Sequence, residues 1–135
     1  MMLVVVDTNI LVSALWSKNG MPAKIVSKIL QEELIPCYDW RILSEYKTVL
    51  ARPKFQFKPE ETTALLDWIK TVGRSVVPPE SELQFADESD KKFYEVAKFC
   101  NAKLITGNLK HFPNDDIVMS AQDFMKLLEL SHGSE

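Results

Sequence analysis

Short apolar runs of strand length alternate with longer segments of helical pattern along this chain, and this alternation restricts its fold more than any other feature. The first run, Leu3–Val6, is continuously apolar, which is typical of a strand buried on both faces of a parallel sheet. The expected strands are Leu3–Val6, Leu34–Tyr38, Ser75–Val77, Lys103–Thr106 and Ile117–Met119. The expected helices are Thr8–Trp16, Pro22–Gln31, Trp40–Ala51, Pro59–Val72, Glu88–Cys100 and Ala121–Leu130. The alternation predicts an α/β fold whose parallel strands are joined by right-handed crossovers.

The length of 135 residues predicts a single domain over residues 1–130, followed by a polar tail at 131–135. Pro78 and Pro79 directly follow one short strand and predict that it lies at an edge of the sheet. The net charge of −3 argues against a protein that coats nucleic acid by bulk electrostatics. It is compatible with a nuclease whose acidic site is neutralised by metal ions.

Cys37 and Cys100 lie far apart in the sequence and form no CxxC pair, so we expect two free thiols in a reducing compartment. The apolar runs are far shorter than the roughly 20 residues of a membrane span. Met1–Val6 also lacks the basic start of a secretory signal. These features predict a soluble, cytoplasmic protein that does not interact with membranes.

Asp7 follows the first apolar run directly, which places it at the carboxyl end of the first strand. Active sites of parallel α/β sheets lie at this edge, near the point where the strand order reverses. The position also suits an N-cap of the helix that begins near Thr8, because Asp, Thr and Asn all serve as caps. The residue pattern leaves both interpretations open.

Two further acidic residues lie at unusual places on predicted helices. With about 100° of rotation per residue, Glu45 falls about 40° outside the apolar arc of its helix, so it faces either a cleft or solvent. Asp90 falls inside the apolar arc of the Glu88–Cys100 helix, where an unpaired carboxylate is costly. Asp87 and Asp90 also suit a capping box at the start of that helix.

These three carboxylates, from distant segments, predict one acidic pocket. Clustered carboxylates repel one another, so near neutral pH they are either protonated or bound to a metal ion. Oxygen ligands favour Mg²⁺ or Mn²⁺ over zinc. Such an ion activates water for attack on phosphorus, so the residues indicate a metal-dependent phosphodiesterase.

Four segments of the chain resemble the motifs of the PIN domain family, in the family's order. They are Val4–Ala14, Leu43–Tyr46, Asp87–Phe93 and Leu104–Asn108. The resemblance covers residues 3–130 and is greatest to the VapC-like toxin components of toxin–antitoxin pairs. It implies a PIN-like three-layer sandwich, with a five-stranded parallel sheet flanked by helices. It also implies a metal-dependent endoribonuclease that cuts single-stranded or exposed RNA.

The resemblance assigns roles to individual residues. The implied catalytic residues and ligands of Mg²⁺ or Mn²⁺ are Asp7, Glu45 and Asp90. Polar positions that line the family's site fall on Thr8, Asn9 and Thr106, of which Asn9 and Thr106 would orient water or the carboxylates. The implied partners are an RNA substrate, a second copy of the chain in a homodimer, and an antitoxin whose tail blocks the acidic cleft.

Asn108 departs from the family pattern, because many members have Asp at this position. Asn keeps an oxygen ligand but lacks the charge, so a second metal ion would bind more weakly. Asp87, in the turn before its helix, is placed to supply the missing charge. We expect one bound ion, with a second arriving with RNA. The alternative is a PIN-fold module that binds RNA or metal with weak or no turnover.

Scattered basic residues near the expected cleft suit either contacts with RNA phosphates or ordinary solvated helix faces. They are Lys18, Lys47, Arg52, Lys91, Lys92, Lys110 and His111. The loop from Arg52 to Pro59 alternates aromatic and basic residues. We expect at least one of its Phe side chains to pack in the core, while the loop also suits base stacking, a second subunit or an antitoxin peptide.

Overall fold

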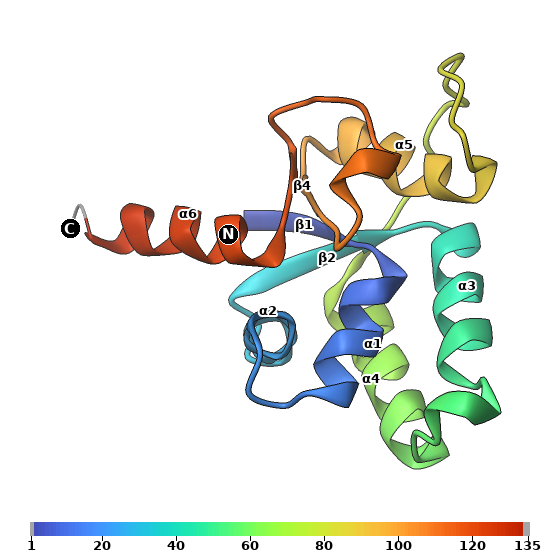
Figure 1. Cartoon of the computed structure of the whole chain (residues 1–135), viewed down its shortest axis with the longest axis vertical. Helices are drawn as coiled ribbons and strands as arrows, with labels where there is room; N and C mark the ends of the chain where they lie inside the picture. Colours follow the sequence, from blue (N-terminus) through green and yellow to red (C-terminus); the bar gives the residue numbers. More distant parts are fainter. Residues whose placement is uncertain (1, 134–135) are drawn as a thin grey trace.

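The computed structural model describes residues 2–133 and contains one five-stranded sheet (Figure 1). The strands are β1 (Met2–Val6), β2 (Leu34–Tyr38), β3 (Arg74–Ser75), β4 (Lys103–Ile105) and β5 (Val118–Met119). Their spatial order is β3-β2-β1-β4-β5, and all four pairings are parallel. The predicted α/β fold with a five-stranded parallel sheet is therefore confirmed.

Helices cover both faces of this sheet, which makes three layers (Figure 1). The helices are α1 (Thr8–Trp16), α2 (Met21–Leu30), α3 (Trp40–Leu50), α4 (Pro59–Val72), α5 (Lys91–Cys100) and α6 (Ala121–Gly133). Three short 3₁₀ helices are η1 (Pro53–Phe55), η2 (Glu88–Asp90) and η3 (Leu109–His111). Helix α5 packs on β1, β2 and β4, while α2, α3 and α4 contact β2 from the other layer. Right-handed crossovers require this division, because the chain moves outward through β2 and β3 and then returns to β4.

The boundaries differ from the expectations by more than one residue at three places. The edge strand β3 ends at Ser75 rather than Val77, because the prolines that follow cannot continue a ladder. The predicted helix Glu88–Cys100 divides into η2 and α5 at Lys91. Helix α6 extends past Leu130 to Gly133, so part of the predicted polar tail is helical, and residues 134–135 of that tail lie outside the described residues.

The centre of the core is β1, whose last three residues, Val4–Val6, are buried between the two helical layers. As the continuous apolar run predicts, neighbouring strands flank β1 on both sides: Val4 lies opposite Pro36 of β2 and Lys103 of β4. The strand order reverses at β1, so the crevice between the carboxyl ends of β1 and β4 is the expected place for a site. Asp7 and Thr106 directly follow these two strands.

Within residues 2–133, none of the helices combines the length and the apolar character that crossing a lipid bilayer would require.

Candidate active site

Asp7 occupies the N-cap position of α1, but its side chain accepts no capping hydrogen bond from the helix. The carboxylate instead faces β4 and α5. Thr106 Oγ1 donates a hydrogen bond of 2.8 Å to Asp7 Oδ2, and Asn9 Nδ2 lies 3.4 Å from the same oxygen. The Asp7 side chain is buried, and its backbone N–H donates to the Ile105 carbonyl across the crevice. Of the two interpretations of Asp7, the structure therefore supports the site at the strand end.

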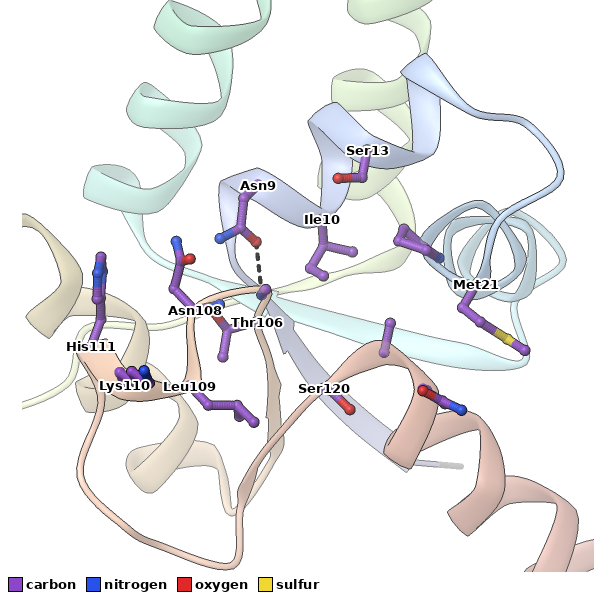
Figure 2. A pocket seen from close by; sticks show the side chains of 14 residues that line it. Asn9, Ile10, Ser13, Met21, Thr106, Asn108, Leu109, Lys110, His111 and Ser120 are labelled. Carbon is purple, nitrogen blue, oxygen red and sulfur yellow. Dashed lines mark hydrogen bonds between the residues drawn. The ribbon is translucent and has the colours of Figure 1, made fainter.

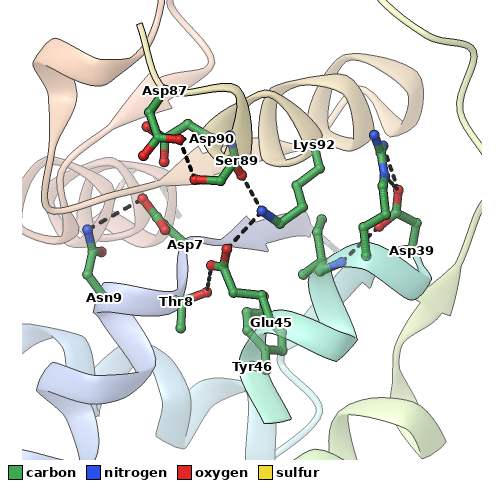
Figure 3. A network of polar contacts seen from close by, with 12 residues as sticks. Asp7, Thr8, Asn9, Asp39, Glu45, Tyr46, Asp87, Ser89, Asp90 and Lys92 are labelled. Atoms are coloured by element: carbon green, nitrogen blue, oxygen red, sulfur yellow. Dashed lines mark hydrogen bonds and ion pairs between the residues drawn. The ribbon is translucent and has the colours of Figure 1, made fainter. Parts of the chain in front are cut away.

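Asn9 links this carboxylate to the loop after β4. The Gly107 backbone N–H donates to Asn9 Oδ1 over 3.1 Å (Figure 2). This contact turns Asn9 Nδ2 toward Asp7 (Figure 3). The Asn108 backbone N–H in turn donates to Thr106 Oγ1 over 2.9 Å. The predicted orienting positions, Asn9 and Thr106, are thus held by backbone donors and both contact Asp7.

Glu45 lies on the face of α3 that borders the same crevice. Its Oε2 accepts a hydrogen bond from Thr8 Oγ1, and its Oε1 lies 2.8 Å from Lys92 Nζ. The Tyr46 hydroxyl donates to the Val6 carbonyl, which holds this turn of α3 against the end of β1. Glu45 therefore faces the cleft rather than solvent, and Thr8 positions it.

Lys92 corrects one sequence expectation. The sequence suited it either to contacts with RNA phosphates or to a solvated helix face, but it is buried and donates to both Glu45 and the Ser89 carbonyl. It therefore joins α5 to α3 beneath the site (Figure 3). Lys92 lies about 40° outside the apolar arc of α5, the same offset as that of Glu45 on α3. This position at the border of the buried face is the feature of the sequence that indicates its burial.

Asp87 and Asp90 lie at the start of α5. Asp87 Oδ1 accepts hydrogen bonds from the backbone N–H and hydroxyl of Ser89, so Asp87 caps η2. Asp87 also faces the crevice. The Asp90 side chain is half-buried and makes no cap (Figure 3). Within the described residues its Oδ2 is buried with no hydrogen bond of good geometry, although His111 Nδ1 lies 3.2 Å away.

These side chains line one groove of about 330 Å³ between α1 and α3, which we call the acidic groove. Its lining residues are Asp7, Thr8, Asn9, Val12, Glu45, Val49, Phe55, Asp87, Asp90, Asn108 and His111. Thr106 lines a larger cavity of about 850 Å³ that adjoins this groove at Asn9, Asn108 and His111 (Figure 2). All eight site residues expected from the sequence are thus at this one place. His111, which the sequence analysis named only among the basic residues near the cleft, lines both pockets.

The electrostatics of the groove follow from burial and like charge. Burial raises the pKa of Asp7 to about 6; the Thr106 hydrogen bond opposes this rise, and the nearby Asp90 and Glu45 carboxylates add to it. Burial and the neighbouring Asp87 charge also raise the pKa of Asp90. Both carboxylates would therefore be stabilised in their ionised form by a cation in the groove.

Among the described residues, no group of three or more His, Cys, Asp or Glu side chains has the geometry of a metal site. Glu45 is turned toward Lys92, which leaves Asp7 and Asp90 as the acidic pair that faces the open groove. The donor set of these two residues fits a hard divalent cation, which prefers carboxylate oxygens. Asp90 Oδ2 is buried without a good hydrogen bond, and burial and the nearby carboxylates disfavour the ionised form of Asp7 when no cation is bound.

Comparison with known families agrees with this geometry. A profile of the PIN domain matches residues 3–110, which is most of the chain. The chain belongs to the PIN domain family. An uncharacterized protein of the archaeon Methanocaldococcus jannaschii is 31% identical over 132 residues, a match that covers 96% of this chain and 81% of that protein.

The PIN domain is a nuclease fold, and its members are typically metal-dependent nucleases. The family usually binds divalent metals, and PIN nucleases bind RNA. The first three motifs of the resemblance place their acidic residues, Asp7, Glu45 and Asp90, around the acidic groove. The fourth, Leu104–Asn108, contributes Thr106 and Asn108.

The raised pKa of Asp7 predicts a pH-dependent stability in the absence of metal. The folded protein holds a proton on Asp7 up to about pH 6, whereas the unfolded chain releases it near 3.8. This proton stabilises the folded state fully below about pH 4, and the contribution is lost as pH rises through 6. In EDTA, the free energy of unfolding of wild type relative to Asp7→Asn should fall by about 2 kcal/mol between pH 4 and pH 7. A difference that stays constant over this range would contradict the burial effect.

Proposed function

We propose that this PIN domain is a metal-dependent endoribonuclease that hydrolyses phosphodiester bonds of single-stranded or exposed RNA, with Mg²⁺ or Mn²⁺ as cofactor. The observation that carries the proposal is the buried Asp7 carboxylate facing Asp90 in an open groove at the topological switch point of the sheet. A divalent cation bound there would supply Lewis-acid activation of the phosphate and of water.

The residues of the groove have distinct proposed roles. Asp7 and Asp90 hold the ion, and Glu45 is the third acidic residue, kept at the rim by Thr8 and Lys92. Thr106 and Asn9 orient the Asp7 carboxylate through the contacts described above. Asp87 and Asn108 line the groove, where Asp87 supplies a charge that Asn108 lacks.

The biological setting follows from the resemblance to VapC-like toxins. We propose that the protein is the toxin of a toxin–antitoxin pair in the cytoplasm, that it forms a homodimer, and that a cognate antitoxin blocks the acidic groove. Support comes from the order of the four motifs and from the position of their acidic residues around one groove. The direct test is cleavage of a labelled single-stranded RNA by purified protein, with and without metal.

A second function is favoured by two observations on the charge of the site. Asn108 lines the groove where many family members carry Asp, and Glu45 is neutralised by Lys92. Both reduce the negative charge available to metal ions, as expected for a module that binds RNA or metal with little turnover.

Asn108→Asp distinguishes the two functions. If the chain is an active nuclease with one resident ion, the added carboxylate should change its cleavage rate by less than about tenfold, the smallest effect usual for residues around a metal site. The measurement is the initial rate of RNA cleavage in saturating Mn²⁺. Asp116→Asn, which changes a charge outside the groove, is the control and should leave the rate unchanged. A rise from near zero to measurable cleavage would instead favour the binding module.

A further inference from the structure

An aromatic cluster lies at the end of the acidic groove opposite to the carboxylates. It consists of Trp16, the last residue of α1, with Phe55 and Phe57 of the loop between α3 and α4. The rings of Phe55 and Phe57 are stacked, with centroids 5.4 Å apart and planes 13° apart. Trp16 packs edge-on against both rings, with centroids 5.8 Å from Phe55 and 6.1 Å from Phe57.

The three rings differ in what they contact. Phe57 packs against the hydrophobic core and anchors the cluster, as expected for one Phe of this loop. Phe55 lines the acidic groove itself. Trp16 is 63% exposed, so a large aromatic surface stands in solvent beside the groove. Core packing explains Phe57, but it does not explain the exposure of Trp16.

The charge around the cluster is suited to phosphate. Arg52, Lys54 and Lys58 are exposed in the same short loop, and Lys54 Nζ lies 5.2 Å from the centre of the Phe55 ring. Aromatic rings interleaved with cations are the arrangement by which proteins bind single-stranded nucleic acid, through stacking of bases and pairing with the backbone. The opposite end of the groove is acidic, so the two ends have complementary roles, one for the scissile phosphate and one for a base a few nucleotides away.

We propose that the aromatic cluster is a base-stacking subsite, which holds a base of single-stranded RNA while the acidic end of the groove holds the phosphate to be cut. The proposal rests on the proposed nuclease function and adds where a base of the single-stranded substrate is bound. The nine residues of α1 separate Asp7 from Trp16 by about 13 Å along the helix axis. That distance is spanned by about four nucleotides at the stacked spacing of about 3.4 Å, and by fewer in an extended strand.

The test measures binding without cleavage, in protein that carries Asp7→Asn. The probes are an eight-nucleotide single-stranded RNA and a ribose-phosphate chain of equal length and charge that has no bases. Trp16→Leu should weaken binding of the RNA about tenfold and leave binding of the abasic chain unchanged, because a stacked base is lost but no phosphate contact is. RNA should also quench the fluorescence of Trp16, and this quenching should be absent from Trp16→Leu.

Trp40→Leu is the matched control, because Trp40 is 75% exposed and lines a different pocket. It should change neither affinity. Phe55→Leu, which removes a ring that lines the groove, should repeat the base-selective loss. The melting temperature of each variant checks that the fold is kept. Because Trp16 is mostly exposed, Trp16→Leu should melt near the wild-type temperature.

Three results would overturn the proposal. An equal loss of affinity for both probes would show that the cluster supports the fold or the charge rather than a base. Unchanged RNA binding in Trp16→Leu would indicate that the aromatic cluster contacts a protein partner rather than a base. If the same variant also changed from dimer to monomer, that partner would be a second copy of the chain. RNA cleavage that depends on Asp7 but not on Trp16 would refute the subsite and leave the nuclease intact. Base-selective binding without metal-dependent cleavage would refute the nuclease function and leave the base-stacking subsite intact.

Discussion

Asp7→Asn is expected to reduce metal-dependent RNA cleavage by at least about a hundredfold while the protein stays folded. Residues that merely orient a metal ligand account for about 10–100-fold in affinity or activity, and Asp7 is proposed as a ligand itself. The side chain of Asn keeps an oxygen that accepts the Thr106 hydrogen bond, so the local structure is preserved. The measurement is the single-turnover cleavage rate in saturating Mn²⁺.

The stability of this variant is a second readout of the same residue. Because burial and like charges raise the pKa of Asp7, removal of its charge at pH 7 should stabilise the metal-free fold. Loss of activity with increased stability is the signature of a functional rather than a structural carboxylate. Asp116→Asn, at an exposed residue before β5, is the matched control and should change neither property. Cleavage by Asp7→Asn at the wild-type rate would remove Asp7 from the mechanism.

Arg41→Met is expected to produce the largest loss of stability, about 3 kcal/mol. The Arg41 guanidinium lies 2.7 Å from an Asp39 oxygen and 2.9 Å from Glu95 Oε1. Both carboxylates are almost completely buried, with side-chain exposures of 3% and 1%. Removal of the cation leaves two buried negative charges near each other, which is far more costly than the loss of an exposed ion pair. Denaturant unfolding at pH 7 measures the change.

The network of Arg41 also determines how α5 sits beside α3. Asp39 caps α3 by accepting from the Ile42 backbone N–H, and Glu95 of α5 accepts from the Ser81 backbone N–H. Lys28→Met is the control, because Lys28 pairs with Glu33 at the surface. Loss of this pair should change the unfolding free energy by less than about 1 kcal/mol. Equal effects of the two substitutions would show that the buried network contributes no more than a surface ion pair.

The local sequence pattern was sufficient where one continuous segment determines both the secondary structure and the position of a side chain. The apolar run Leu3–Val6 leads directly into Asp7, so the strand, its burial and the position of the carboxylate follow from consecutive residues. Asp90 was found because it falls inside the apolar arc of its predicted helix, and Glu45 because it lies only about 40° outside the arc of its own helix. Parallel strands bring their carboxyl ends together, which explains why residues from four segments meet in one groove.

Local pattern failed where partners lie far apart in the chain. Lys92 pairs with Glu45 across 47 positions, and its place near the apolar arc of its helix does not identify this partner. His111 comes beside Asp90 only because η3 folds back over the start of α5. The aromatic cluster joins the end of α1 to the loop after α3, and no periodicity connects these segments. Such contacts depend on tertiary packing rather than on propensity.

The central claim is that this PIN domain cuts RNA with a metal ion held by Asp7 and Asp90. The most direct measurement is cleavage of a labelled single-stranded RNA by purified protein, folded and free of any bound partner, in Mg²⁺, in Mn²⁺ and in EDTA. The account predicts cutting with either metal, none in EDTA, and recovery when metal is restored. Cutting that persists in EDTA, or no cutting with either metal, would contradict it.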